Sequence, residues 1–483
     1  MTSQLLELGR RAAAPAPPPT RALARLHLFD ALVAAFASAA TQEGSRAARH
    51  RESLGTDLSD ASPADIVLAL GRRIRATELD DLQLESVTTA AAAVIPALMG
   101  AAAVAQKREY GADDVLDAAT AGYEVMATLG LAAGGPDFLY GQGGWPSLSG
   151  AGPAAAATAG RLLGLDAEEI AHAIALALLS TPRSLRGNGE DGRWLSFGLA
   201  VTAGFHAALA AQSGSRGDLA LLDQDTGGIS GREIVPELRA VLEQPWQAGQ
   251  GLAKAHLKQW ASAGQVAAAI DAAGVLQDTR GFRADDVLAV DVHVPPAYRR
   301  MIDQPSGSGR MWSLVSAQYQ VATRLLHPQD LFDCARPALR DSPAFRRLMG
   351  VVHVHKEEPL AARHPESYPA RVAVTLRGGT TADYLSDGRS PSPLWDWESL
   401  LAKARAVAAR AAAEERVDPL CEAVIGFSDS AQFLRAAMSA VLPPGATKER
   451  ARAVIRLSAG KRVLGPAMAH RLRRAYPDSC GAG

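Results

Sequence analysis

Apolar residues recur every three to four positions through most of the first 277 residues, and this spacing predicts helices with one buried face. Alanine-rich runs strengthen the prediction, because alanine has the highest helix propensity. Thr20 is placed to cap a first helix, and Pro63 to begin the next. Helices are expected at about 21–40, 64–73, 94–106, 113–130, 153–163, 167–180, 196–213 and 261–276.

The period of the pattern changes near Gln277. Short segments that alternate in polarity and are rich in β-branched residues predict strands at 287–294, 351–355 and 371–376. Helical spacing is found at 313–326, and again at 397–415, 428–441 and 447–459. We therefore expect a mainly α protein. A large all-helical domain, residues 1–277 and 396–483, would carry an inserted α+β lid domain, residues 278–395.

Composition narrows the class of protein. The 483 residues carry 50 basic and 51 acidic side chains, and this balance excludes strong electrostatic binding to nucleic acid or to an anionic membrane. No run of about 18 uncharged apolar residues occurs, so we expect no membrane-spanning helix. Cys334, Cys421 and Cys480 form no CxxC pair, and the N-terminus resembles no signal peptide. These features predict a soluble cytoplasmic protein.

General ligand-binding motifs are weak or absent. Residues 187–192 match GxGxxG, but a predicted helix precedes them where a dinucleotide site needs a strand, so a polar loop is the simpler interpretation. His293, His353 and His355 lie in predicted strands and are either metal ligands or exposed sheet residues; we favour the second. We expect neither a metal nor an organic cofactor.

Residues 144–152, Gly-Trp-Pro-Ser-Leu-Ser-Gly-Ala-Gly, precede an alanine-rich helix and the segment Arg-Leu-Leu-Gly-Leu-Asp at 161–166. This arrangement resembles the MmgE/PrpD family, which includes 2-methylcitrate dehydratase, cis-aconitate decarboxylase and iminodisuccinate epimerase. Further segments resemble motifs of that family in the family's order: 28–30, 78–81, 122–124, Lys258 with Asp271, 316–322 and 390–394. The resemblance implies a helical domain with an inserted α+β lid, a homodimer, and chemistry through a carbanion or enolate beside a carboxylate.

The sequence departs from the family mainly at histidines. Pro146 and Ser196 stand where the family has histidine, and Thr89 fills a third such place. Two more positions of the family's pattern, a Cys or His and a later His, are occupied by Ala263 and Ala267. These losses imply a larger and less charged substrate than a tricarboxylate of the citrate type.

Three residues that match polar positions of the family's motifs are the catalytic candidates. The resemblance implies that Lys258 and Arg193 bind or polarise a carboxylate, and that Tyr319 serves as acid or base. Each has a structural alternative: Lys258 as a surface or hinge charge, Tyr319 as a core residue, and Arg193 as the partner of Glu190 or Asp191. We expect Lys258 and Tyr319 to face one cavity.

A second group of residues is expected to line the substrate pocket: Asp80, Thr89, Trp145, Ser147, Ser149 and Ser196. Asp80 has the alternative of a surface position beside a helix, and Trp145 that of a packing residue. Thr89 is expected to line the pocket without the chemistry of the histidine that it replaces.

The leading hypothesis is a divergent lyase of this family that removes water from a β-hydroxy acid or related carbonyl compound. A small carboxylate would be its substrate, and a tailoring step in bacterial secondary metabolism would fit the alanine-, glycine- and arginine-rich composition. An epimerase or isomerase, a decarboxylase, and a degenerate homologue that only binds a ligand remain the alternatives.

Overall fold

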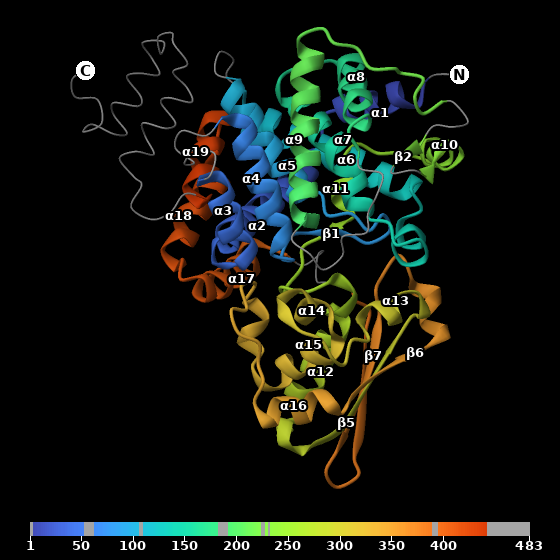
Figure 1. The fold of residues 1–483 in the computed structure, drawn as a ribbon, viewed down its shortest axis with the longest axis vertical. Helices are drawn as coiled ribbons and strands as arrows, with labels where there is room; N and C mark the ends of the chain where they lie inside the picture. The colour runs from blue at the N-terminus through green and yellow to red at the C-terminus, as the bar shows by residue number, and fades with distance from the viewer. Residues whose placement is uncertain are drawn as a thin grey trace, which may run out of the picture.

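The computed structural model describes residues 3–52, 62–105, 110–181, 192–223, 228–229, 232–388 and 395–441. Figure 1 shows two lobes, one built of helices and one in which helices lie beside a sheet. The protein is mainly helical, so the predicted fold class is confirmed. The predicted helix at 447–459 and the segment 390–394 lie outside the described residues.

The helical lobe contains both early and late parts of the chain. Its N-terminal helices are α1 (Gln4–Ala13), α2 (Pro18–Ala37), α3 (Gln42–Glu52), α4 (Pro63–Ala76), α5 (Ala91–Val104), α6 (Ala112–Ala132), α7 (Pro146–Leu162), α8 (Ala167–Leu178), α9 (Gly192–Gln212), α10 (Val235–Glu243) and α11 (Gln250–Ala253). The short strands β2 (Gly228–Ile229) and β3 (Arg232–Glu233) pair beside them. Its C-terminal helices are α17 (Trp397–Ala411), α18 (Val417–Gly426) and α19 (Ser430–Val441).

Helix α7 is the centre of this lobe and packs against α5, α6, α8 and α9. Its small residues allow the neighbouring backbones to approach closely. A side chain on Gly204 of α9 would place its Cβ 2.0 Å from the Gly152 carbonyl oxygen, so only glycine fits at that crossing. The alanine-rich sequence therefore determines how tightly the helices pack as well as how readily they form.

The second lobe holds a mixed sheet of order β6-β5-β7-β8. Strand β6 (Val352–Lys356) runs parallel to β5 (Val287–Val294), whereas β7 (Ala370–Leu376) and β8 (Thr381–Ser386) are antiparallel. Buried valines on β5, β6 and β7 alternate toward one face and join a hydrophobic core with α12 (Ala267–Arg280) and α15 (Ala317–Leu326). The short helices α13 (Pro296–Ile302), α14 (Gly309–Val315) and α16 (Pro343–Gly350) complete the lobe.

The two lobes have separate hydrophobic cores. One core combines residues from Leu5 to Ala261 with residues from Leu400 to Met438, and Leu314 and Cys334 also join it. The other includes most of the buried apolar residues between Trp260 and Ala382, together with Leu82, Leu84 and Val87. The residue numbers of the domain boundary remain a prediction.

Two helices are long and apolar enough to cross a membrane by length and composition alone, which the sequence analysis did not anticipate. They are Pro18–Ala40 and Gly192–Gln212, and 78% and 56% of their most apolar windows lie buried inside the protein. Both pack against other helices of the lobe, so we interpret them as core helices.

A buried ion pair joins the two ends of the chain. The Lys403 ammonium of α17 donates to the Asp30 carboxylate of α2 at 2.6 Å, and each side chain is at most 3% exposed. Phe29 and Trp397 make an edge-to-face ring contact beside the pair. Burial raises the pKa of Asp30, although Lys403 acts in the opposite direction.

We predict that Lys403→Met lowers the free energy of unfolding by about 3–5 kcal/mol, because it leaves a buried carboxylate without a cation. Asp30 would then hold its proton more tightly in the folded than in the unfolded chain, so the variant should be less stable at pH 8 than at pH 5. Urea unfolding at both pH values measures this. Lys356→Met is the matched control, because Lys356 pairs with Glu358 at 3.9 Å on the surface; equal losses in the two variants would contradict the prediction.

Candidate active site

A two-strand ladder brings two distant parts of the chain together at the lower edge of the helical lobe (Figure 1). Strand β1 (Leu82–Gln83) pairs antiparallel with β4 (Ala255–His256), with Leu82 opposite His256. The ladder places the acidic segment 78–81, which precedes β1, beside Lys258, which follows β4. Two motifs of the sequence analysis therefore meet at one site.

Four charged side chains meet there, and we call them the buried charge cluster: Arg75, Glu78, Asp80 and Lys258. The Lys258 ammonium lies 3.3 Å from a Glu78 carboxylate oxygen and 3.7 Å from Asp80 Oδ1, and it donates to the Ser262 carbonyl oxygen at 3.3 Å. Arg75 lies 2.9 Å from Asp80 Oδ1 and 3.0 Å from Glu78 Oε1. Each of the four residues is less than 10% exposed.

The cluster gives its two carboxylates opposite properties. Burial alone would raise the pKa of Glu78, but Arg75, Lys258 and Arg193 outweigh burial and lower this pKa to about 2. Burial raises the pKa of Asp80 to about 7, against the opposing effect of Arg75 and Lys258 and with support from Glu78. Glu78 therefore stays charged at neutral pH, whereas Asp80 exchanges a proton there. Asp80 Oδ2 is buried without a hydrogen-bond partner among the described residues.

Arg193 lies beside the cluster at the start of α9. Its guanidinium carbon is 4.5 Å from the ring centre of Trp145 and 4.4 Å from that of Trp194. The Arg75 guanidinium approaches the same rings at 5.8 and 5.5 Å. Burial lowers the pKa of Arg193 to about 10, partly offset by Glu78. Arg193 thus stays a cation at neutral pH, and its alternative partners Glu190 and Asp191 lie outside the described residues.

Three of the residues predicted to line the pocket with hydroxyl groups, Thr89, Ser147 and Ser149, form hydrogen bonds within the protein. Thr89 donates from its amide and its hydroxyl to Ser147 Oγ at 3.2 Å, and Ser147 donates to the Val87 carbonyl oxygen at 3.3 Å. Ser149 Oγ donates to the Trp145 carbonyl oxygen. These bonds tie the chain after β1 to the first turn of α7. Ser196 is partly buried on α9.

Tyr319 has different neighbours from Lys258. Its hydroxyl accepts a hydrogen bond from the Arg340 amide at 3.0 Å, and its ring packs on Trp312 and Phe345 in the core of the second lobe. It lines a cavity of about 280 Å³ whose lining includes Arg336 but not Lys258. The structure therefore does not bring Tyr319 and Lys258 into that cavity together, because Tyr319 extends toward the 330–340 loop. A catalytic role of Tyr319 remains a prediction.

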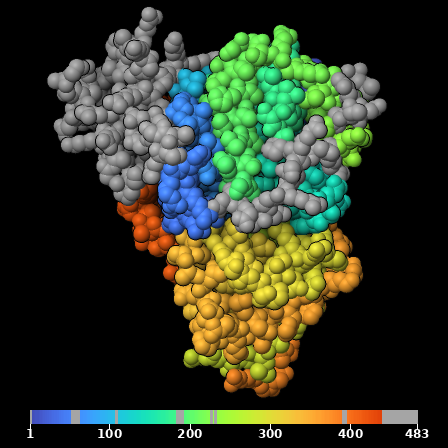
Figure 2. Space-filling model, viewed as in Figure 1, coloured from blue at the N-terminus to red at the C-terminus, as the bar shows by residue number. Residues whose placement is uncertain are grey.

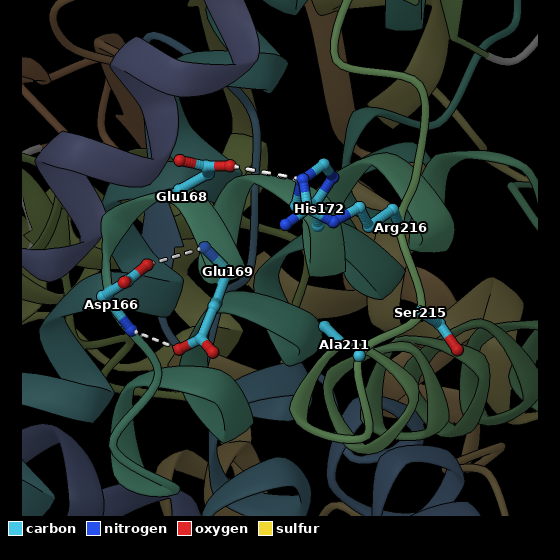
Figure 3. A pocket seen from close by; sticks show the side chains of 8 residues that line it. Asp166, Glu168, Glu169, His172, Ala211, Ser215 and Arg216 are labelled. Carbon is cyan, nitrogen blue, oxygen red and sulfur yellow. Dashed lines mark hydrogen bonds and ion pairs between the residues drawn. The ribbon is translucent and has the colours of Figure 1, made fainter.

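Another cavity of about 220 Å³ lies between the start of α8 and the end of α9 (Figure 3). Its acidic side chains have structural partners. Asp166 accepts from the Glu169 amide and Glu169 accepts from the Asp166 amide, each at 2.9 Å, which is a capping box. We therefore assign these carboxylates to the cap of α8.

The sequence analysis missed three residues of the site: Arg75, His27 and Tyr123. His27 Nδ1 lies 2.7 Å from Asp81 Oδ2, the Tyr123 hydroxyl donates to the same oxygen, and the Ala91 amide donates to Asp81 Oδ1 at 3.2 Å. These contacts fix the residue that follows Asp80. Tyr123 lies in a family motif, 122–124, which indicates importance but no contact. Arg75 lies in the last turn of α4, beyond the end at residue 73 that the sequence predicted for this helix.

Two of the three histidines of the sheet lie against each other, and His353 on β6 is exposed. His293 and His355 stack with ring centres 5.0 Å apart, and each has a carboxylate neighbour, Glu357 at 3.4 Å and Asp291 at 2.7 Å respectively. Within the described ranges, no group of histidine, cysteine, aspartate and glutamate has the arrangement of a metal site.

Comparison with known proteins shows the family of this chain. Residues 12–232 match the MmgE/PrpD N-terminal domain, and residues 260–425 match the MmgE/PrpD C-terminal domain. The chain belongs to the MmgE/PrpD family. The family includes lyases, among them dehydratases and decarboxylases. The chain is similar to the cis-aconitate decarboxylase-like protein oryM of Aspergillus oryzae (strain ATCC 42149 / RIB 40), with 26% identity over 401 residues, which cover 76% of this chain and 80% of that protein.

We predict that His27→Phe lowers the free energy of unfolding by about 1–3 kcal/mol, because the buried Asp81 loses a hydrogen-bond donor. Chemical denaturation measures the loss. His206→Phe is the matched control, because His206 is exposed on α9 and should change stability by less than about 0.5 kcal/mol. A neutral His27→Phe variant would show that His27 does not hold Asp81.

Proposed function

We propose that this MmgE/PrpD protein is a cofactor-independent lyase that removes water from a β-hydroxy acid. The buried charge cluster is the observation that carries the proposal. Lys258 and Arg193 supply positive charge for a carboxylate, and Asp80 supplies a carboxyl group whose pKa of about 7 suits it to give or take a proton at neutral pH. The lost histidines therefore do not remove acid–base chemistry from the site.

In the proposed reaction, ionised Asp80 takes the proton from the carbon beside the activating carbonyl. The electron pair of the broken C–H bond forms an enolate, and Lys258 and Arg193 offset its charge. The C–O bond to the β-hydroxyl then breaks, and the leaving oxygen takes the proton from Asp80 and departs as water. Asp80 ends in its ionised form, so the cycle consumes no other reactant.

Decarboxylation is the second candidate, and the similarity to the oryM protein favours it. Here the C–C bond to one carboxylate breaks, carbon dioxide leaves, and protonated Asp80 gives its proton to the resulting carbanion. The two reactions require opposite protonation states of Asp80 at the start. This difference makes the pH profile informative.

We predict that purified protein, incubated in D₂O with β-hydroxy acids of one to three carboxylates and with cis-aconitate, releases water from one hydroxy acid. Mass spectrometry identifies the product. Lys258→Met and Asp80→Asn should each lower kcat/KM by about 10²–10⁴-fold. Lys254→Met is the matched control, because Lys254 pairs with Glu85 at 3.0 Å at an exposed position of the same segment.

Other outcomes of this assay separate the alternatives. Release of carbon dioxide would replace dehydration by decarboxylation, and deuterium uptake without loss of mass would indicate an epimerase or isomerase. Full activity of Asp80→Asn would contradict the role given to Asp80. A loss in Tyr319→Phe as large as that in Lys258→Met would assign Tyr319 to catalysis in spite of its distinct contacts.

We predict that kcat/KM for dehydration rises with pH through about 7 and then becomes constant, because the reaction begins with ionised Asp80. A decarboxylase that begins with protonated Asp80 would instead lose activity as the pH rises through the same value. In either case the step near pH 7 should be absent from the residual activity of Asp80→Asn. A step that persists in this variant would assign the titration to another group.

A further inference from the structure

A buried arginine of the second lobe contacts the helical lobe beside the buried charge cluster. Arg310 belongs to α14, which Figure 1 shows at the edge of the second lobe that faces the helices. Its guanidinium donates to the Ala76 carbonyl oxygen at 2.6 Å and lies 2.9 Å from a Glu43 carboxylate oxygen of α3. It also donates to the Cys334 carbonyl oxygen at 2.9 Å. One buried side chain therefore joins three segments of the chain.

The contact at Ala76 falls between two members of the cluster. Ala76 is the last residue of α4, directly after Arg75 and two positions before Glu78. The last four carbonyl groups of a helix have no partner within the helix, and a basic side chain near them also interacts favourably with the helix dipole. Arg310 thus supplies, from the other lobe, a hydrogen bond that the end of α4 cannot make for itself.

The turn that follows α4 needs such support. Glu78 has a φ of 54°, in the left-handed region that residues other than glycine rarely adopt. The Thr77 hydroxyl accepts from the Leu79 amide and holds the turn from within, whereas Arg310 holds it from the second lobe. A strained residue persists only when surrounding contacts enforce its conformation. Here these contacts keep Glu78 3.3 Å from Lys258.

A second buried arginine contacts the other half of the cluster. Arg336 donates to the Ala261 carbonyl oxygen at 2.9 Å, three residues after Lys258. It also donates to Ser313 Oγ at 3.0 Å, and this hydroxyl donates to the Arg310 carbonyl oxygen at 2.7 Å. The two arginines are therefore connected through α14, and together they contact both chain segments that form the cluster.

We infer that Arg310 is a positioning residue of the proposed reaction: it holds the turn that carries Glu78, and through this turn it sets the environment of Asp80. The inference rests on the proposed role of Asp80 as proton carrier. It deepens that proposal by naming the contact through which the second lobe acts on the site. Arg310 itself touches neither substrate nor the proton.

The groups around Asp80 decide the direction of the effect. Two cations, two carboxylates and the partners of one carboxylate surround it: Arg75 and Lys258, Glu78 and Asp81, and His27 and Tyr123 beside Asp81. The hydrogen bonds and ion pairs of Arg310 within the described residues go to none of these side chains, so it acts on Asp80 through the backbone of the turn. A looser turn would move Glu78 and admit water. Both changes would lower the pKa of Asp80, because burial and the charge of Glu78 raise it.

An infrared titration of the ligand-free protein tests this inference. The C=O band of a protonated carboxyl group disappears as the group ionises. The band of Asp80 is isolated in each protein by subtracting the spectrum of the same protein with Asp80→Asn, because burial raises the pKa of Asp30 and of Glu124 as well. In the wild-type protein the midpoint should lie at about pH 7.

The informative variant is Arg310→Met/Glu43→Met. Removing both partners avoids the unpaired buried carboxylate that Arg310→Met alone would leave. Because the bond to the Ala76 carbonyl oxygen is lost, the Asp80 midpoint should fall by at least about one pH unit. In the dehydration assay kcat should fall by about 10–100-fold. The change in KM should be smaller, because Arg310 is not among the cations proposed to bind the substrate.

A matched control removes an arginine–glutamate pair elsewhere. Arg371 and Glu357 lie 2.7 Å apart on the sheet of the second lobe, and Arg371→Met/Glu357→Met should change neither the Asp80 midpoint nor kcat. If the Arg310 double variant does not fold, Arg310→Lys provides the second measurement. It keeps a cation beside Glu43, but one ammonium group cannot reproduce the planar contacts of a guanidinium, so the midpoint should again fall.

A midpoint that is unchanged or raised in the folded Arg310 variant would overturn the inference. An equal fall in the control would also overturn it, since the effect would then be a general loss of stability. These results differ from failure of the proposed reaction, because the titration needs no substrate. A lowered midpoint in a protein that releases no water from any hydroxy acid supports the role of Arg310 at the site and contradicts the dehydratase. An unchanged midpoint in a protein that does release water contradicts the role of Arg310 and supports the dehydratase.

Discussion

The site depends on the removal of four charged side chains from water within the buried charge cluster. An isolated buried carboxylate or ammonium group loses hydration worth several kcal/mol, so each charge in the cluster requires an opposite neighbour. Two cations, Arg75 and Lys258, contact two carboxylates, Glu78 and Asp80. The pairing is unequal, because Glu78 is held in its charged form while Asp80 retains a proton up to neutral pH. One electrostatic balance therefore produces both a fixed negative charge and a titratable group.

This balance can exist only where the backbone is rigid enough to keep the charges in place. The β1–β4 ladder supplies one constraint, and the bonds of Asp81 with His27 and Tyr123 supply another. The small residues of α7 extend the same principle to the whole lobe, because backbones in close contact leave little room for the helices to shift. The pKa of Asp80 therefore depends on how tightly the helices pack, because looser packing would admit water and lower this pKa.

The sequence predicted the parts of the fold that have a strong local pattern. The longest helices of the first lobe and three strands of the sheet follow from apolar spacing. The shorter helices α1, α3, α10, α11 and α18 were missed, and so was strand β8. Its Tyr384 is 40% exposed and its other positions do not alternate cleanly, so it lacks the pattern of a half-buried strand. The family motifs pointed to Lys258 and Asp80 because the order and spacing of residues in this sequence match those of the family. They could not show that Arg75 turns inward, that His27 reaches Asp81, or that Tyr319 extends toward the 330–340 loop, because those contacts are set by tertiary packing.

The loss of site histidines need not be a loss of neutral-pH chemistry. An imidazole is useful at pH 7 because its ordinary pKa is near 6.5, and the protein has to do little to tune it. A carboxyl group reaches the same range when burial opposes its ionisation and a neighbouring carboxylate adds to the effect, as Glu78 does for Asp80. The two kinds of proton carrier differ in the charge that they bring to the site. A protonated histidine adds a positive charge to the site, whereas an ionised aspartate beside Glu78 adds a negative charge. On this argument the proton carrier also affects the charge of the site, because a carboxyl group adds no positive charge in either of its protonation states.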